Sequence, residues 1–167
     1  MTVSVKQLGG ALATVLLLAG CGGESTSEAE RVGTEFAGQA VEVCRAALAD
    51  KQQWAPFPAE NFDPRDPDPS QFTEVSGWLA DEVAPTFEGW LADLDALGTP
   101  PTGQEAWDNV LTAVNEIVEL NAAQVQAARE DDTDAFAVAT DDLNSTQDKL
   151  VAATEEAGVA ECADVHA

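Results

Sequence analysis

The fold is read most clearly from residues 102–129, TGQEAWDNVLTAVNEIVELNAAQVQAAR. Apolar side chains recur there at intervals of three and four residues, which places them on one face of an α-helix. The opening Thr102–Glu105 has the pattern of a capping box, in which the two side chains bind free backbone donors of the first turn. We therefore predict an amphipathic helix that ends near Arg129. Its apolar stripe is Trp107, Val110, Leu111, Val114, Ile117, Val118 and Val125.

Three other segments have the same period and predict helices over about residues 28–53, 70–97 and 133–157. The second of these contains Pro85, which cannot donate a backbone hydrogen bond, so we expect a kink or a break there. Polar residues and glycines mark the helix ends. The predicted N-terminal caps are the capping box Ser27–Glu30, Asp68 before Pro69, and Asp132 or Thr133, and the predicted C-terminal caps are Gly98 and Gly158.

Four amphipathic segments joined mostly by short connections predict an all-α fold, an up-down-up-down four-helix bundle. The exception is the connection at residues 54–70, WAPFPAENFDPRDPDPS, which holds five of the eight prolines of the chain. It predicts a long crossing loop, because proline disfavours helix at its own position and at the preceding one. We expect residues 28–167 to form a single helical domain.

Residues 1–20 have the layout of an export signal rather than of a folded element. Lys6 supplies positive charge, an apolar stretch follows from Leu8 to Leu18, and the small residues Ala19 and Gly20 come next. The stretch is too short for a membrane-spanning helix. We therefore expect residues 1–20 to be removed from the mature protein as a signal peptide.

Leu18-Ala19-Gly20-Cys21 resembles the lipobox of bacterial lipoprotein precursors. The resemblance implies that the thiol of Cys21 receives a diacylglyceryl group, and that a peptidase cuts before Cys21 and leaves it as the lipidated first residue. It implies an extracytoplasmic protein, held at the outer face of the plasma membrane or, in a two-membrane cell, at the outer membrane. The alternative is an ordinary cleaved signal with a cysteine near the cut. Residues 22–27, GGESTS, read as a flexible tether.

The charge of the chain is strongly acidic. All 31 Asp and Glu residues but only six of the seven Lys and Arg residues follow Cys21, so this part carries a formal charge of 6 − 31 = −25. Such a charge argues against nucleic acid as a partner and against attraction to anionic lipid headgroups. We interpret it as a solvated surface rather than as an acidic recognition patch.

If Cys21 is lipidated, Cys44 and Cys162 remain as a pair. An exported protein meets oxidising conditions, so we expect a disulfide between them, with two separate thiols as the alternative. The predicted last helix ends near the start of the first one. The chain after Gly158 must therefore fold back along the first helix for Cys162 to reach Cys44.

Few residues offer catalytic or metal-binding chemistry, so we predict no enzyme activity, no cofactor and no metal. The only histidine, His166, lies one residue from the C-terminus, where a catalytic base is hard to hold in place. A zinc site using Cys162 and His166 would compete with the disulfide. The acidic stretches DPRDPDPS and EDDTD do not match the calcium loop of an EF-hand and read as turns and caps, and no Glu-x-x-His pairs suggest a diiron site.

Two groups of residues are candidates for binding. Asn121 falls near the apolar stripe of its helix, and we interpret it as a buried side chain whose hydrogen bond sets helix register, with a ligand contact as the alternative. Tryptophan at helical spacing is usually core, whereas Trp54 beside the crossing loop is the one that we expect to be exposed. Together with Phe57 and Phe62 it marks a possible interaction surface.

The sequence therefore suggests a lipid-anchored binding or interaction module of the cell envelope. Its expected partners are the membrane, through the anchor on Cys21, and an envelope protein or a small ligand. The alternatives are a structural spacer without a specific ligand and, less well supported, a metal carrier or an enzyme.

Overall fold

The computed structural model of the protein describes residues 31–166, and this part of the chain is all-helical and contains no strand. Cys21, the tether and the predicted capping box Ser27–Glu30 lie outside the described residues. The α-helices within this range are α1 (Thr34–Lys51), α2 (Phe72–Trp78), α3 (Ala84–Ala96), α4 (Gln104–Arg129) and α5 (Thr133–Ala157).

Helix α1 is shorter than predicted, because it begins at Thr34 and not at residue 28. The backbone at Gly33 is extended, with φ −60° and ψ 147°. The backbone N–H of Val32 donates to the carbonyl oxygen of Ala157 at 3.2 Å, so this part of the chain is held by the end of α5. The spacing of Val32 and Phe36 is helical. The hydrogen bond to Ala157, which is distant in sequence, nevertheless holds Val32 outside the helix.

The predicted second helix is divided by a π-helical segment, Leu79–Val83, that links α2 to α3. Pro85 lies in the first turn of α3, immediately after this segment. The backbone remains helical through the junction, with φ −60° and ψ −41° at Leu79 and φ −59° and ψ −47° at Ala84. The helical winding changes just before Pro85, but the helical backbone is not broken there, and the expected kink is not clearly shown. The wider π turn accommodates a residue that has no N–H to donate.

The predicted capping box at the start of α4 is wrong. Thr102 does not cap the helix, because its hydroxyl donates to the carbonyl oxygen of Arg31 at 3.0 Å. The capping position is Gly103, in the left-handed conformation with φ +69° and without a side-chain cap. A Cβ on Gly103 would lie 2.4 Å from the carbonyl carbon of Arg31, so the two backbones approach too closely for any other residue.

The other caps agree with the sequence. The carboxylate of Asp132 accepts from the backbone N–H of Ala135 at 2.9 Å, and that of Asp68 accepts from Ser70 at 2.9 Å. Asp68 begins a short 3₁₀ turn, Pro69–Gln71, that leads into α2. Gly98 and Gly158 have positive φ angles of 74° and 80° after α3 and α5, as C-terminal caps require.

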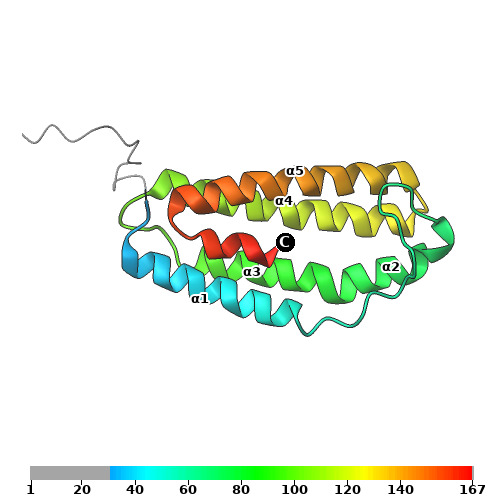
Figure 1. The fold of residues 1–167 in the computed structure, drawn as a ribbon, viewed down its shortest axis with the longest axis horizontal. Coiled ribbons are helices and arrows are strands. Elements are labelled where there is room, and N and C mark those ends of the chain that lie inside the picture. The colour runs from blue at the N-terminus through cyan, green and yellow to red at the C-terminus, as the bar shows by residue number, and fades with distance from the viewer. Residues whose placement is uncertain (1–30, 167) are drawn as a thin grey trace, which may run out of the picture.

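The helices pack side by side along one long axis (Figure 1). Helices α4 and α5 contact each other extensively, while α2 and α3 both pack on α4, and α1 packs on α3. The 3₁₀ helix η3 (Ala160–Val165) follows α5 and lies between α5 and α1. Arg31, Gly103 and Gly158 meet at one end of the molecule, and the turn between α4 and α5 lies at the other.

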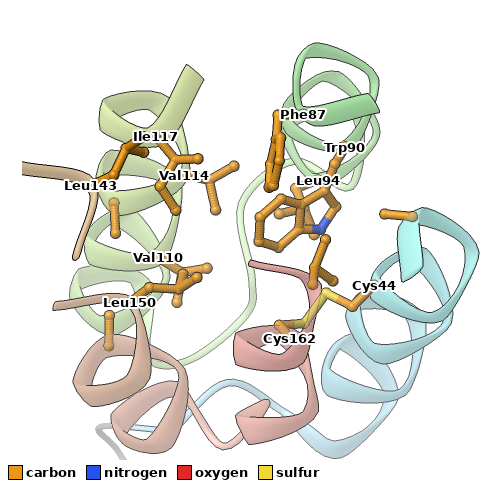
Figure 2. Packing of buried hydrophobic residues seen from close by; sticks show 14 of the residues in the cluster. Cys44, Phe87, Trp90, Leu94, Val110, Val114, Ile117, Leu143, Leu150 and Cys162 are labelled. Carbon is orange, nitrogen blue, oxygen red and sulfur yellow. A yellow bond between two sulfur atoms is a disulfide. The ribbon is translucent and has the colours of Figure 1, made fainter. Parts of the chain in front are cut away.

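A continuous apolar core fills the space between the helices (Figure 2). Trp90 and Leu94 of α3 face Val110 and Val114 of α4, and the disulfide lies beside them. Alanines at the contacts, such as Ala40 with none of its surface exposed, let the helices approach closely. Among the described helices, none combines the length and the hydropathy that crossing a membrane requires.

Candidate functional site

The crossing loop, which was predicted over residues 54–70 and spans residues 52–68 in the structure, covers the part of the molecule that α1 does not reach. Helix α1 has 18 residues, whereas α4 has 26, so α1 ends well before the far end of the other helices. Specific contacts hold the loop in place. Arg65 Nε donates to Asp141 of α5 at 3.0 Å, and the side-chain amide of Gln71 donates to the carbonyl oxygen of Glu60 at 3.0 Å. The loop therefore lies against α2 and α5, although the exposed Arg65–Asp141 ion pair contributes little to holding it there.

Trp54 is half-buried, which corrects the expectation that it would be exposed. Its indole N–H donates to the hydroxyl of Thr86 at 2.9 Å. Its ring packs edge-on against Trp78, with 5.5 Å between the centroids, and the ammonium group of Lys51 lies 5.8 Å from it. Trp54 therefore fixes the start of the loop on α3 and offers little surface to a partner.

Phe57 and Phe62 are close together, as the predicted interaction surface requires. Their ring centroids are 5.5 Å apart, and Phe57 packs edge-on against Trp78 at 5.1 Å. Phe62 packs edge-on against Phe136 of α5 at 5.6 Å. Phe57 keeps 43% of its surface exposed, and among the large apolar side chains of the described residues only Val138 is more exposed. The loop thus presents an accessible aromatic ring above a partly buried one.

A cavity of about 310 Å³ lies beneath these two rings. Its walls come from the loop and from three helices, so residues distant in sequence converge on it. Its inner wall is formed by side chains that are themselves buried, and no charged side chain lines it. The apolar lining residues are Phe57, Phe62, Pro64, Val75, Leu79 and Phe136. The cavity is open to solvent on its outer side, and its apolar inner wall and aromatic rim are features that ligand sites share.

One polar side chain, Gln124 of α4, contributes to the wall of this cavity. Only 7% of its surface is exposed, and its Nε2 donates to the hydroxyl of Thr140 on α5 at 2.9 Å. The hydroxyl of Thr140 donates in turn to the carbonyl oxygen of Phe136 at 3.0 Å. Sequence reasoning missed this pair, although two polar residues at apolar positions of adjacent helices were a detectable signal.

Asn121 lies one helical turn before Gln124 and is buried, with 5% of its surface exposed. Its Nδ2 has no hydrogen-bond acceptor among the described residues. The structure therefore does not support the interpretation that the Asn121 amide group sets helix register by donating a hydrogen bond. A buried polar link between α4 and α5 is made by the Gln124–Thr140 pair instead, and the more exposed Lys149–Glu116 ion pair also joins these helices.

A wider groove of about 530 Å³ runs between α3 and α4. Leu91, Leu111 and Val118 form its floor, and Glu88 and Asp95 lie on its rim. None of its lining side chains is fully buried, so the groove is the open space between two helices. The cavity beneath the loop is the better candidate site, because buried side chains from three helices shape it.

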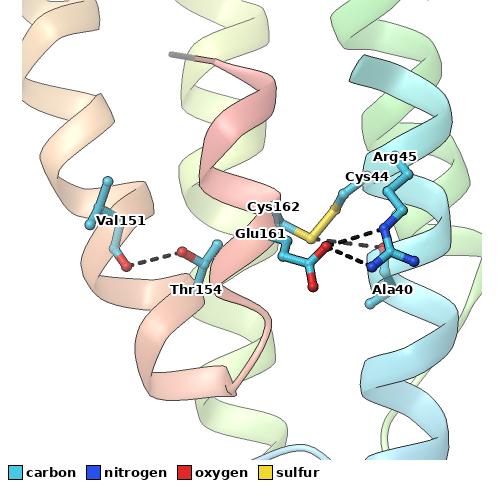
Figure 3. Close-up of a disulfide and its surroundings, with 7 residues drawn as sticks. All are labelled: Ala40, Cys44, Arg45, Val151, Thr154, Glu161 and Cys162. Atoms are coloured by element: carbon cyan, nitrogen blue, oxygen red, sulfur yellow. Dashed lines mark hydrogen bonds and ion pairs between the residues drawn. A yellow bond between two sulfur atoms is a disulfide. The ribbon is translucent and has the colours of Figure 1, made fainter. Parts of the chain in front are cut away.

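Cys44 and Cys162 form a disulfide, in agreement with the expected pairing, with their Cα atoms 5.1 Å apart (Figure 3). The chain after Gly158 folds back through η3 to reach α1. Beside the disulfide, Arg45 Nη2 pairs with Glu161 at 2.8 Å, and both side chains are more than half exposed. Exposed ion pairs contribute little, so the covalent bond is the main clamp on the C-terminal segment.

His166 packs against the aromatic side of the core. Its ring centroid lies 5.7 Å from that of Phe87. Burial, with the nearby charge of Lys51 as a second cause, lowers the pKa of His166 from 6.5 to about 4. The ring is therefore neutral at physiological pH and acts as a packing group.

The acidic stretches are used in turns. Asp63 accepts from the backbone N–H of Arg65 at 2.9 Å, in addition to the caps made by Asp68 and Asp132. Within residues 31–166, no three Asp, Glu, His or Cys side chains are grouped as metal ligands. The sulfur of Cys162 is bonded to Cys44, so it is not free to bind zinc with His166.

No family model matches the chain, and comparisons with curated proteins and with solved structures likewise found no significant match.

Proposed function

We propose that this protein is a lipid-anchored extracytoplasmic binding module that recognises its ligand or partner through the crossing loop. The anchor would be a diacylglyceryl group on Cys21, as the lipobox-like sequence implies. The observation that carries the proposal is the position of the exposed Phe57 ring, above a cavity at the end of the helices remote from Arg31.

The distance between the two ends supports this arrangement. Nine residues lie between Cys21 and Arg31, so the ten steps from one to the other can extend over at most about 33–36 Å. Gln124, in the wall of the cavity, lies 21 residues along α4 from Gly103, which corresponds to about 30 Å of helix. A chain anchored at Cys21 can therefore present the loop well beyond the lipid headgroups.

We also infer that α2, the π segment and α3 act as one element, so that the domain is an up-down-up-down four-helix bundle with an irregular second helix. The support is the uninterrupted helical backbone from Phe72 to Ala96 and the packing of both α2 and α3 on α4. In such a bundle the loop and η3 fill the two places that the short α1 leaves open.

The proposal is tested by photo-crosslinking on intact cells. A photo-reactive amino acid replaces Phe57, and a matched control replaces Gly38, which is exposed on α1 and has no neighbouring atom within 4 Å of an added Cβ. We expect a recurrent adduct from position 57 that position 38 does not give. The same adducts from both positions, or none from position 57, would instead favour a structural spacer without a ligand.

A further inference from the structure

We propose that the cavity beneath the crossing loop binds a small uncharged molecule that has an apolar body and one hydrogen-bond donor. The inference rests on the proposed function in one respect, since both assign recognition to the loop. It goes further by naming the chemistry of the ligand.

The size of the cavity argues for a small molecule rather than a protein segment. A volume of about 310 Å³ is at the lower end of the range for ligand pockets and is too small for a docked helix. The loop lines one side through Phe57, Phe62 and Pro64, buried side chains line the opposite side, and part of the cavity is open to solvent. A ligand there would touch aromatic rings on one face and aliphatic side chains on the other.

The lining argues for an uncharged ligand. The side chains around the cavity are apolar except for that of Gln124, and none of them is ionised. A charged molecule would lose its hydration there without gaining an opposite charge, which is strongly unfavourable. The acidic surface of the protein adds repulsion for anions.

Gln124 argues for a donor on the ligand. Its Nε2 is already bonded to Thr140, so the amide is held in one orientation. Within the described residues no donor reaches its Oε1, although only 7% of the surface of Gln124 is exposed. This oxygen is not itself buried, so solvent can reach it, and a ligand hydroxyl or N–H in the cavity would take the place of water as its donor.

The test uses two photo-reactive probes that differ only in the donor. One is a trifluoromethyl aryl diazirine with a benzylic alcohol, and the other is its methyl ether. The full-length protein is labelled in phosphatidylcholine vesicles, and the labelled residues are mapped by peptide mass spectrometry. The two probes are compared at equal free concentrations, because the ether partitions into lipid more strongly than the alcohol, and the position of each label is read out.

We expect label on the cavity residues, with the alcohol labelling about three- to tenfold more than the ether, as one hydrogen bond would give. Gln124→Leu should bring this ratio to about one. The matched control Thr140→Val breaks the same Gln124–Thr140 bond but keeps the Gln124 acceptor, so it should retain the preference. Thermal unfolding by circular dichroism verifies that both variants fold.

A ratio of about one in the unmodified protein, or label concentrated in the groove between α3 and α4, overturns the inference even if Gln124→Leu fails to fold. A preference for the alcohol over the ether that Gln124→Leu leaves unchanged also overturns the inference. The experiments distinguish a failure of this inference from a failure of the proposed function. Specific crosslinks from position 57 without label in the cavity would leave the interaction surface standing and exclude the small molecule. Cavity label without such crosslinks would leave the small molecule standing and remove a macromolecular partner.

Discussion

Individual side chains decide where this molecule is rigid and where it can bind. The disulfide ties the C-terminal segment to α1, and the Gln124–Thr140 bond ties α4 to α5. The disulfide pairing could be predicted, because the cysteines can be counted in the sequence and the lipobox-like stretch suggests an oxidising compartment. The Gln124–Thr140 bond could not be assigned, because which polar residues face each other depends on how the two helices are rotated.

Removing the disulfide should strongly destabilise the protein. It closes a loop with a sequence separation of 118 residues, so the Cys44→Ala/Cys162→Ala variant should lose about 2–5 kcal/mol of unfolding free energy. Urea denaturation measures this loss. The unmodified protein in reductant should show a similar decrease, and a change of less than about 1 kcal/mol in either experiment would contradict the structural role of the bond.

His166 should make stability depend on pH. Its pKa is about 4 in the folded protein and 6.5 as the reference for the unfolded chain, so the unfolded chain binds the proton first. The stabilisation from neutral His166 is complete above pH 6.5 and is lost as the pH falls toward 4. His166→Gln stays uncharged throughout this range.

Urea denaturation at several values between pH 7.5 and 4.5 checks this prediction. The unfolding free energy of the unmodified protein should fall more steeply with decreasing pH than that of His166→Gln, since titration of the carboxylates is common to both. Parallel curves for the two proteins would show that His166 is not held neutral by burial.

Helix ends show how far local sequence reasoning extends. Asp68, Asp132, Gly98 and Gly158 mark their helix ends as expected, because a cap is made within a few residues of the chain. The start of α4 differed from the prediction, since Thr102 bonds to Arg31 from another part of the chain. Contacts of that kind have no local signature.

A matched pair of glycine substitutions tests the close approach at the start of α4. Gly103→Ala should cost about 2 kcal/mol or more, because Gly103 has a positive φ and an added Cβ would meet the backbone of Arg31. Gly38→Ala should instead stabilise the protein by about 0.5–1 kcal/mol, because Gly38 lies within α1 with open space around it. Equal effects of the two substitutions in thermal unfolding would contradict the close contact between residues 31 and 103.

The molecule as a whole combines regular packing with an irregular cover. The all-α class follows from the spacing of apolar residues, which is a property of the sequence alone. The site depends on features that the sequence does not specify by pattern, namely the early end of α1, the π segment at Leu79–Val83 and the path of the crossing loop. Phe57 and Phe62 were recognisable as candidates, whereas the cavity beneath them arises only from tertiary packing.

The anchor is the property on which the proposed role depends. Attachment at Cys21 would hold one end of the helices near the membrane and leave the loop free at the other. It would also remove one thiol and leave Cys44 and Cys162 as an even pair.

The most direct test is the intact mass of the protein purified from membranes. We predict the mass of residues 21–167 with a lipid on Cys21, two hydrogens fewer for the disulfide, and any further acyl chain on the new N-terminus. The mass of unmodified residues 1–167 would contradict a lipid anchor at Cys21.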